Sequence, residues 1–301
     1  MPKTKVFLIS ARDCAHAVQT LLGKIDPSDL AGKRVALKAN FNSADPFPAS
    51  TNLDTLRFLL RGLKAAGARD ITLGERSGMG RTREVLSARG VFKLGEELGF
   101  SIQVLDELPG SGWVAFREKA HHWKRGFLMA RLFAEADAVV QTCCLKTHQF
   151  GGHFTLSLKN SVGMVARYDP KDHYDYMGEL HSSPEQRALI AELNAAYRPR
   201  FILMDGTKAF VKGGPASGDL VAPNVMLAGT DRVAMDALGV AILRHFGTTN
   251  EVSSGAIFHQ AQLARAVELG LGVGSFDDIQ LEPLDAEARK LSTAIASQFG
   301  G

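Results

Sequence analysis

Two lysines and two histidines lie within fourteen residues near the middle of the chain, interleaved with glycine: Lys146, His148, His153 and Lys159. Asn160 follows directly. The segment just upstream, residues 136–142, is a short apolar run that predicts a buried parallel strand. These side chains would then follow the carboxyl end of a strand, where open α/β sheets place their ligand sites. Such residues suit the binding of an anion, a metal ion or a covalent cofactor better than a hydrophobic core.

The individual side chains suggest different chemical roles. His148 can act as a general acid or base, because an unperturbed imidazole titrates near neutral pH. Lys159, if it is desolvated, can act as a nucleophile or a cofactor anchor. Lys146, together with Lys38 and Arg76, would supply positive charge for a carboxylate or phosphate. We therefore predict His148, Lys159 and Lys146 as catalytic residues.

A metal site is a second interpretation of the same region. His148, His153 or His173 could bind a divalent metal ion together with Asp205, although no tight ligand spacing requires it. His148 and His173 are the ligands that we predict. A third interpretation is that these side chains are solvated loop charges without a site.

The rest of the chain alternates predicted strands and helices. Strands are expected at 34–38 and 71–73, and a helix over 53–66 has Thr51 as its expected N-cap. A second helix is expected over 127–135. The alternation is typical of βαβ units. In the segment 155–160, polar and apolar residues alternate, which places the polar side chains on one face of an extended strand.

These patterns predict an α/β fold with mostly parallel sheets and flanking helices, in two lobes around a cleft. We expect residues 1–245 to form the α/β domain and residues 246–301 to form a helical extension packed on it. The glycine-rich turn at 74–80 follows a strand but does not complete a dinucleotide-binding fingerprint.

Composition excludes several classes of protein. A chain of 301 residues with 45% hydrophobic and 22% charged residues is typical of a globular enzyme. A net charge of +3 is too small to indicate nucleic-acid binding. Three cysteines predict neither an iron–sulfur cluster nor a disulfide framework. No apolar run has the length of a membrane span or a signal peptide, so we expect a cytoplasmic protein.

Several short motifs occur in an order that resembles a bacterial and archaeal family known as domain of unknown function 362. They include Lys38-Ala-Asn40, Glu75, Lys146-Thr-His148, Leu158-Lys159-Asn160, and Asp231 to Asp236. The resemblance extends from about residue 33 to residue 245. It implies an α/β fold and a ligand site. The residues expected to contact the ligand or cofactor are Lys38, Asn40, Glu75, Arg76, Lys159 and Asn160.

A more distant resemblance is to lactate racemase-type enzymes, which have a strand, a Leu-Gly-Thr-His-Arg segment and a helix. Here the corresponding segment is Leu73 to Ser77, followed later by His148, Lys159 and His173. The resemblance implies that Lys159 tethers a nickel pincer nucleotide, that His173 or His181 binds the metal, and that His148 is one base. The position of the other catalytic histidine corresponds to Arg76, which cannot accept a proton usefully.

Two functions are therefore predicted. In the first, the protein is an enzyme that acts on a small anionic metabolite with lysine and histidine chemistry, with or without a metal or tethered cofactor. In the second, it is a non-catalytic protein that binds a metal, cofactor or anion. The sequence leaves the substrate, the reaction and the oligomeric state open.

Overall fold

The computed structural model describes residues 3–151 and 153–299, and twelve strands are present among them. The strands are β1 (Thr4–Ser10), β2 (Arg34–Lys38), β3 (Asp70–Glu75), β4 (Ser101–Val104), β5 (Trp113–Phe116), β6 (Phe127–Ala130), β7 (Ala138–His148), β8 (His153–Thr155), β9 (Pro199–Gly213), β10 (Gly218–Val221), β11 (Val225–Gly229) and β12 (Ile279–Pro283).

The α-helices connect these strands and cover the sheet. They are α1 (Cys14–Ile25), α2 (Leu53–Ala65), α3 (Thr82–Ala88), α4 (Val91–Leu98), α5 (Arg131–Ala134), α6 (Ser157–Asn160), α7 (Tyr176–Ser182), α8 (Gln186–Leu193), α9 (Arg232–His245), α10 (Asn250–Ser253), α11 (Ala261–Glu268) and α12 (Ala286–Ala296). None of these helices combines the length and the apolar character needed to cross a membrane.

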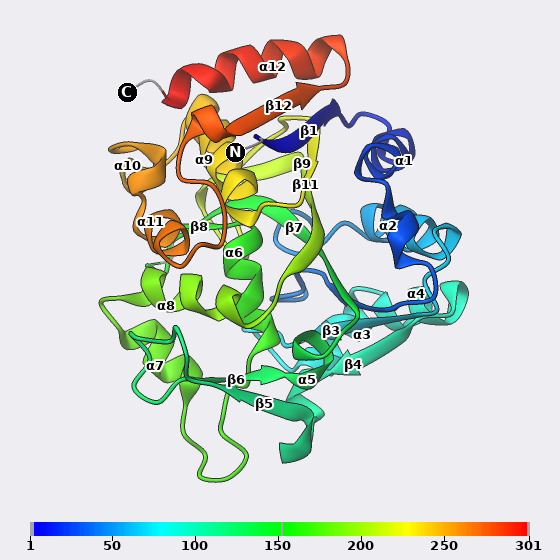
Figure 1. Cartoon of the computed structure of the whole chain (residues 1–301), viewed down its shortest axis with the longest axis vertical. Helices are drawn as coiled ribbons and strands as arrows, with labels where there is room; N and C mark the ends of the chain where they lie inside the picture. Colours follow the sequence, from blue (N-terminus) through cyan, green and yellow to red (C-terminus); the bar gives the residue numbers. More distant parts are fainter. Residues whose placement is uncertain (1–2, 152, 300–301) are drawn as a thin grey trace.

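Ten of the strands form one large, mostly parallel sheet in the order β12-β1-β11-β9-β7-β2-β3-β4. The run β9-β7-β2-β3-β4 is parallel, whereas β11 is antiparallel to both β1 and β9. Two short strands extend this sheet at its centre, because β8 pairs with β7 and β10 pairs with β9 in antiparallel hairpins. β5 and β6 form a separate two-stranded sheet (Figure 1).

Helices cover both faces of the sheet, as the alternation of side chains along the strands requires. In β9, Ile202 and Met204 belong to one hydrophobic cluster with α9, α11 and α12. Phe201 and Leu203, the alternating residues, belong to a second cluster with α1, α2, α3 and α4. These two groups of helices lie on opposite sides of the sheet in Figure 1. The layered α/β class predicted from the sequence is confirmed.

The structure corrects the prediction for the central segment. β7 does not end at Thr142 but continues to His148, so Lys146 and His148 lie within a strand and not in a loop after it. All eleven residues of β7 are buried. The segment 155–160 is not an extended strand either, because β8 ends at Thr155 and the short helix α6 carries Lys159 and Asn160.

Two further local predictions are wrong. Residues 127–135 are the strand β6 followed by the single turn α5, because Phe127 to Ala130 pair with Trp113 to Phe116. The N-cap of α2 is Asn52, whose side chain accepts from the backbone of Asp54. Thr51 instead accepts a hydrogen bond from the backbone of Asn40 at 2.8 Å.

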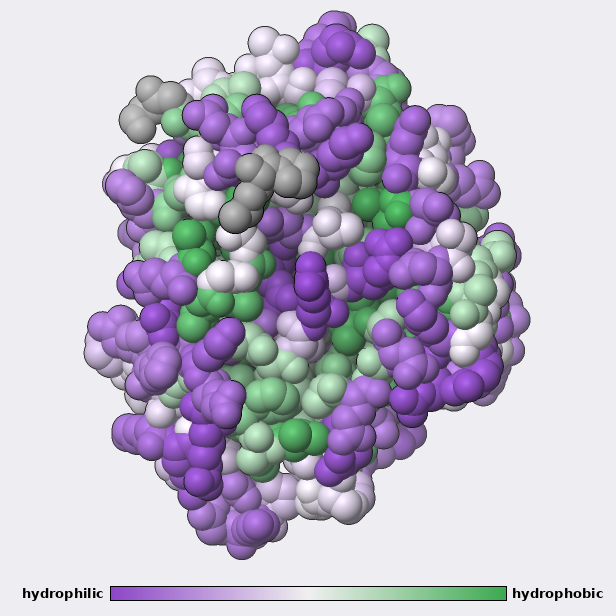
Figure 2. Space-filling model, in the orientation of Figure 1, coloured by the Kyte–Doolittle hydropathy of each residue, from purple (hydrophilic) through white to green (hydrophobic). Residues whose placement is uncertain are grey.

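The C-terminal segment contains the predicted helices, but it also contributes a strand. β12 forms the sheet edge, parallel to β1, and α12 then packs on the cluster that contains α9 (Figure 1). The division into two lobes is not confirmed, since ten of the twelve strands in the described residues belong to one sheet. On the face shown in Figure 2, hydrophilic residues cover most of the outer surface and hydrophobic residues gather near β6 and α5.

Candidate functional site

A cavity of about 580 Å³ lies where the parallel strands β2 and β3 end and β7 continues past them. Its lining comes from these strands, from α6 and α7, and from the loops around them. The residues are Lys38, Asn40, Asn42, Glu75, Arg76, Gly78, Met79, Lys146, His148, Phe150, Thr155, Lys159, Asn160, Val162, Gly163, Arg167, Tyr168, Asp175, Met177, Gly178, His181 and Pro215.

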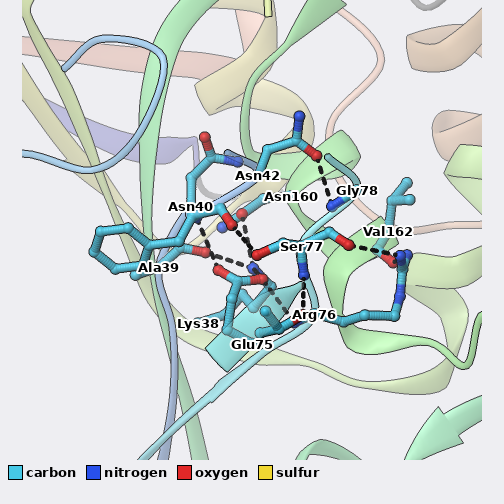
Figure 3. Close-up of polar contacts among 12 residues, drawn as sticks. Lys38, Ala39, Asn40, Asn42, Glu75, Arg76, Ser77, Gly78, Asn160 and Val162 are labelled. Carbon is cyan, nitrogen blue, oxygen red and sulfur yellow. Dashed lines mark hydrogen bonds and ion pairs between the residues drawn. The ribbon is translucent and has the colours of Figure 1, made fainter. Parts of the chain in front are cut away.

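A buried ion pair forms one end of the cavity. The Nζ atom of Lys38, the last residue of β2, lies 2.6 Å from Oε1 of Glu75, the last residue of β3. It also donates to the Ala39 carbonyl at 2.5 Å and to Oδ1 of Asn160 at 3.4 Å (Figure 3). Burial lowers the pKa of Lys38 and raises that of Glu75, which shows that desolvation outweighs their mutual attraction.

Backbone groups complete the surroundings of Glu75. Its carboxylate accepts from the backbone N–H of Phe41 at 2.9 Å and of Arg76 at 3.0 Å. A Cβ atom added to Gly163 would lie 2.6 Å from Glu75 Oε1 and 2.9 Å from Lys38 Nζ, so only glycine allows this approach. The ion pair therefore joins β2, β3 and the turn after α6 into one rigid wall.

Arg76 is buried beside this wall, and its hydrogen bonds go to neutral groups. The guanidinium donates to the carbonyl of Val165 at 2.8 Å and to the carbonyl of Val162 at 2.6 Å (Figure 3). Burial lowers its pKa to about 10, which still leaves it charged at neutral pH. Among the residues of the two described ranges, no carboxylate forms an ion pair with Arg76, so its charge contributes to the potential of the cavity.

Lys146 is also buried and charged, but its ammonium group is fully engaged. It donates to Oδ1 of Asn40 at 2.8 Å, to the carbonyl of Pro48 at 3.2 Å and to the carbonyl of Ala49. These three contacts use all three N–H donors. Lys146 therefore fixes the loop after β2 and adds positive charge, while its donors are not directed at a ligand.

Two buried polar residues form hydrogen bonds with the backbone of the helix α6. Asp236, on α9, accepts from the backbone N–H of Ser157 at 2.8 Å and of Leu158 at 3.0 Å. The amide of Asn194 donates to the Leu158 carbonyl at 3.0 Å. Burial raises the pKa of Asp236 to about 7 despite these hydrogen bonds. These contacts fix the backbone from which Lys159 enters the cavity.

Lys159 differs from the other cavity lysines because its ammonium group has no polar partner among the residues that the structure describes. Its side chain is 9% exposed, and within residues 3–151 and 153–299 it forms neither a hydrogen bond nor an ion pair. Its pKa is lowered to about 8, first by burial and then by the charges of Lys146 and Arg76. Lys159 is therefore available to bind an anion or, when deprotonated, to act as a nucleophile.

Two neutral imidazoles share the cavity with Lys159. Burial, followed by the charges of Lys159 and Lys146, lowers the pKa of His148 to about 2. Its Nδ1 atom is buried and has no partner among the described residues. Nδ1 of His181 lies 2.7 Å from the Met177 carbonyl, which fixes this nitrogen as the N–H donor and leaves Nε2 as the acceptor. Burial also lowers the pKa of His181.

The structure brings together eight of the nine residues predicted for the site. They are Lys38, Asn40, Glu75, Arg76, Lys146, His148, Lys159 and Asn160. The ninth, His173, is an exposed residue that lines a different surface cavity near Gly80 and Trp113. His153 and Asp205 also do not line the cavity. Nε2 of His153 lies 3.4 Å from Nη1 of Arg187, and the Asp205 carboxylate accepts from the Thr55 hydroxyl at 2.6 Å.

The donor set does not fit a zinc-type metal site. Such a site requires three or four histidine, cysteine or carboxylate ligands around one ion. No group of three such side chains occurs in the part of the chain that the structure describes. In the cavity itself, Glu75 is engaged by Lys38, and His148 lies close to two lysines whose charges oppose a cation.

Several lining residues were not predicted. Met79, Phe150 and Tyr168 are large apolar residues at loop positions, and Arg167 donates to the Gly78 carbonyl at 3.3 Å. Their local sequence resembles that of any surface loop. For the lining residues after α6, the sequence offered one signal, which is the polar segment that contains His181.

Fold and cavity together define an α/β protein with a basic cavity at the ends of its parallel strands. The chain belongs to the family described as Domain of unknown function (DUF362), whose profile matches residues 35–241. No curated protein matches the sequence significantly. The matched region contains the cavity residues from β2, β3, β7 and α6, and it ends within α9.

Proposed function

We propose that the protein is an enzyme that acts on a small anionic metabolite bound in this cavity. The observation that carries the proposal is the ammonium group of Lys159, which has no polar partner among the described residues and belongs to a residue that is 9% exposed, in the same cavity as the neutral imidazole of His148. A buried charge without a partner destabilises the fold, and such features cluster at functional sites. A carboxylate or phosphate of the ligand would supply the missing partner.

The proposed chemistry is proton transfer. Lys159, with the fields of Arg76 and Lys146, would bind the anionic group and stabilise negative charge that develops on the ligand. His148 would accept a proton as a general base in the complex, where the charge of the bound anion would offset the lysine charges that contribute to its low pKa. His181 offers a second neutral imidazole on the same cavity. This arrangement supports an isomerase-like reaction, as the distant resemblance to lactate racemase implies.

A covalent role for Lys159 belongs to the same proposal. A pKa of about 8 gives a fraction of free amine at neutral pH, and an amine can form a covalent bond with a cofactor or a carbonyl substrate. The second candidate function is non-catalytic anion binding. It is favoured by the hydrogen bonds that fix Lys146 and Arg76 to backbone and amide oxygens of the fold before a ligand arrives.

Thermal unfolding of the purified protein against a panel of small carboxylates and phosphates tests the binding step. We expect at least one compound to raise the unfolding temperature by several degrees, because a ligand at one hundred times its dissociation constant adds about 2.7 kcal/mol. Lys159→Met should abolish the shift. Lys93→Met removes an exposed lysine on α4 and should retain it. Loss of the shift in both variants, or in neither, would contradict the role of Lys159.

Native mass spectrometry of protein purified without chelator separates the remaining possibilities. A stoichiometric covalent adduct that disappears in Lys159→Met would assign Lys159 the tether role. A bare chain that turns over the ligand found by the panel would support direct lysine and histidine catalysis. A bare chain that binds the ligand without converting it would support the binding function instead.

A further inference from the structure

The cavity has an exposed rim of large hydrophobic side chains and a floor of buried charged residues, which includes Lys38, Glu75 and Lys159. Four large hydrophobic side chains are exposed among residues 3–151 and 153–299, and three of them line this one cavity. They are Met79, Phe150 and Tyr168, with exposed fractions of 43%, 54% and 51%. Single exposed apolar residues are ordinary on a protein surface, but their convergence at one opening indicates a binding function.

The three rim residues come from separate segments. Met79 lies in the loop between β3 and α3, Phe150 lies between β7 and β8, and Tyr168 precedes α7. Two of these segments are joined by the 3.3 Å hydrogen bond from Arg167 to the Gly78 carbonyl. The ring of Phe150 packs edge-on against the ring of His148, with centroids 5.7 Å apart. The apolar rim is therefore in direct contact with the imidazole that we propose as the general base.

The size of the cavity is the second observation. A volume of about 580 Å³ has room for roughly twenty water molecules at about 30 Å³ each. A short carboxylate or a phosphate ion would occupy a small part of it. Such a ligand would also leave Met79, Phe150 and Tyr168 in contact with water.

We infer that the ligand is an amphipathic anion: a carboxylate or phosphate group bound at Lys159, attached to an aromatic or similarly flat apolar group that packs on Phe150, Tyr168 and Met79. This inference rests on the proposed function, because it uses the same ammonium group as the anion site. The charged floor selects the anionic group, and the rim selects the body of the molecule.

Matched pairs of probes test the inference. Binding of acetate and phenylacetate, and of phosphate and phenyl phosphate, is measured by isothermal titration calorimetry. The paired probes share a charged group and differ by the ring. We expect each aryl anion to bind at least tenfold more tightly than its short partner. The carboxylate and phosphate pairs identify which anionic group the floor prefers.

The variants separate the rim from the floor. Phe150→Ala and Tyr168→Ala should each weaken the aryl anions about fivefold or more, with little effect on the short anions. Leu220→Ala is the matched control, because Leu220 is 54% exposed and lies outside the cavity. It should change nothing. Lys159→Met should weaken both members of each pair.

The contrary outcomes are distinct. Equal affinities within each pair, or rim variants that weaken short and aryl anions alike, would overturn the inference and leave the anion site intact. A rim variant that changes only the sedimentation coefficient would assign the rim to contacts between two copies of the chain, which also overturns it. If Lys159→Met leaves all affinities unchanged, or if none of the four probes binds, the proposed function itself fails.

Discussion

Two buried lysines in the same cavity have opposite surroundings. Lys38 is 1% exposed and Lys159 is 9% exposed, so both side chains have lost most of their hydration. Lys38 has a carboxylate partner at 2.6 Å and two further acceptors. Lys159 has no polar partner in the described part of the chain. The comparison separates a lysine that the fold pairs with a carboxylate from one to which the described residues offer no partner.

The difference arises from where the two residues lie in the fold. Lys38 and Glu75 are the last residues of adjacent parallel strands, one and two residues beyond the paired Leu37 and Leu73, so both lie where these strands end. Lys159 lies on α6, outside the sheet, and α6 is fixed through its backbone by Asp236 and Asn194. The protein thus fixes the backbone that carries Lys159 without neutralising the charge of its side chain.

The largest effect is expected when the paired lysine loses its partner. Glu75→Gln keeps the size of the side chain but leaves the Lys38 ammonium buried without a carboxylate. Breaking a buried ion pair in this way costs about 3–5 kcal/mol. Urea unfolding measures the loss.

Glu107→Gln is the control for this variant, because Glu107 forms an exposed pair with Arg83 that is worth at most about 1 kcal/mol. If Glu75→Gln costs no more than Glu107→Gln, then Lys38 and Glu75 are an uncharged hydrogen-bonded pair. The two lysines would then differ in protonation, with Lys38 neutral and Lys159 charged.

Removal of the Lys159 charge is expected to raise the free energy of unfolding, whereas Glu75→Gln lowers it. Its pKa falls from 10.5 to about 8, a difference of about 2.5, so below pH 8 the folded protein holds a poorly solvated ammonium group. At about 1.4 kcal/mol per pH unit, the upper bound of this penalty is about 3.5 kcal/mol, of which water in the cavity screens a part. Lys159→Met should therefore raise the free energy of unfolding by about 1–3 kcal/mol at pH 7, while it abolishes anion binding.

The pH dependence of this gain has a definite direction. Below pH 8 both the folded and the unfolded chain are protonated at Lys159, and the penalty is complete. Between pH 8 and 10.5 the folded protein loses the proton first, so the advantage of Lys159→Met should shrink and vanish near pH 10.5. An advantage that stays constant over this interval would contradict the assignment of the gain to the lysine charge.

Much of the cavity could be predicted because its residues follow parallel strands. Lys38 and Glu75 stand at strand ends that are visible in the sequence as short apolar runs before polar residues. The length of β7 could not be predicted in the same way. Lys146 looks like a loop residue, and only its pairing with Thr155 of β8 and Phe210 of β9 shows that the strand continues.

The choice between His173 and His181 also depended on tertiary structure. Both lie in one polar segment. The helix α7, capped by Asp175, begins between them and places His181 on the cavity while His173 lines another one. The apolar rim was not visible in the sequence either, since Met79, Phe150 and Tyr168 come from three loops that meet only in the folded chain.

The smallest change in stability is expected at His148, next to the unpaired lysine. Its imidazole is buried, its Nδ1 atom has no partner among the described residues, and its low pKa keeps it neutral over the whole range in which proteins are usually studied. His148→Gln retains a polar side chain of similar size that cannot titrate, so no charge is lost at pH 7 and the free energy of unfolding should change by less than about 1 kcal/mol.

Ligand affinity of His148→Gln should remain within a few fold, because Lys159 provides the anion contact. Turnover of the ligand found by the panel should fall by about 10²–10⁴, the usual contribution of a general base. His16→Gln, at an exposed position of α1, is the matched control and should leave all three quantities unchanged. A His148→Gln variant with full turnover would place the base elsewhere on the cavity, and Nε2 of His181 would then be the imidazole to test.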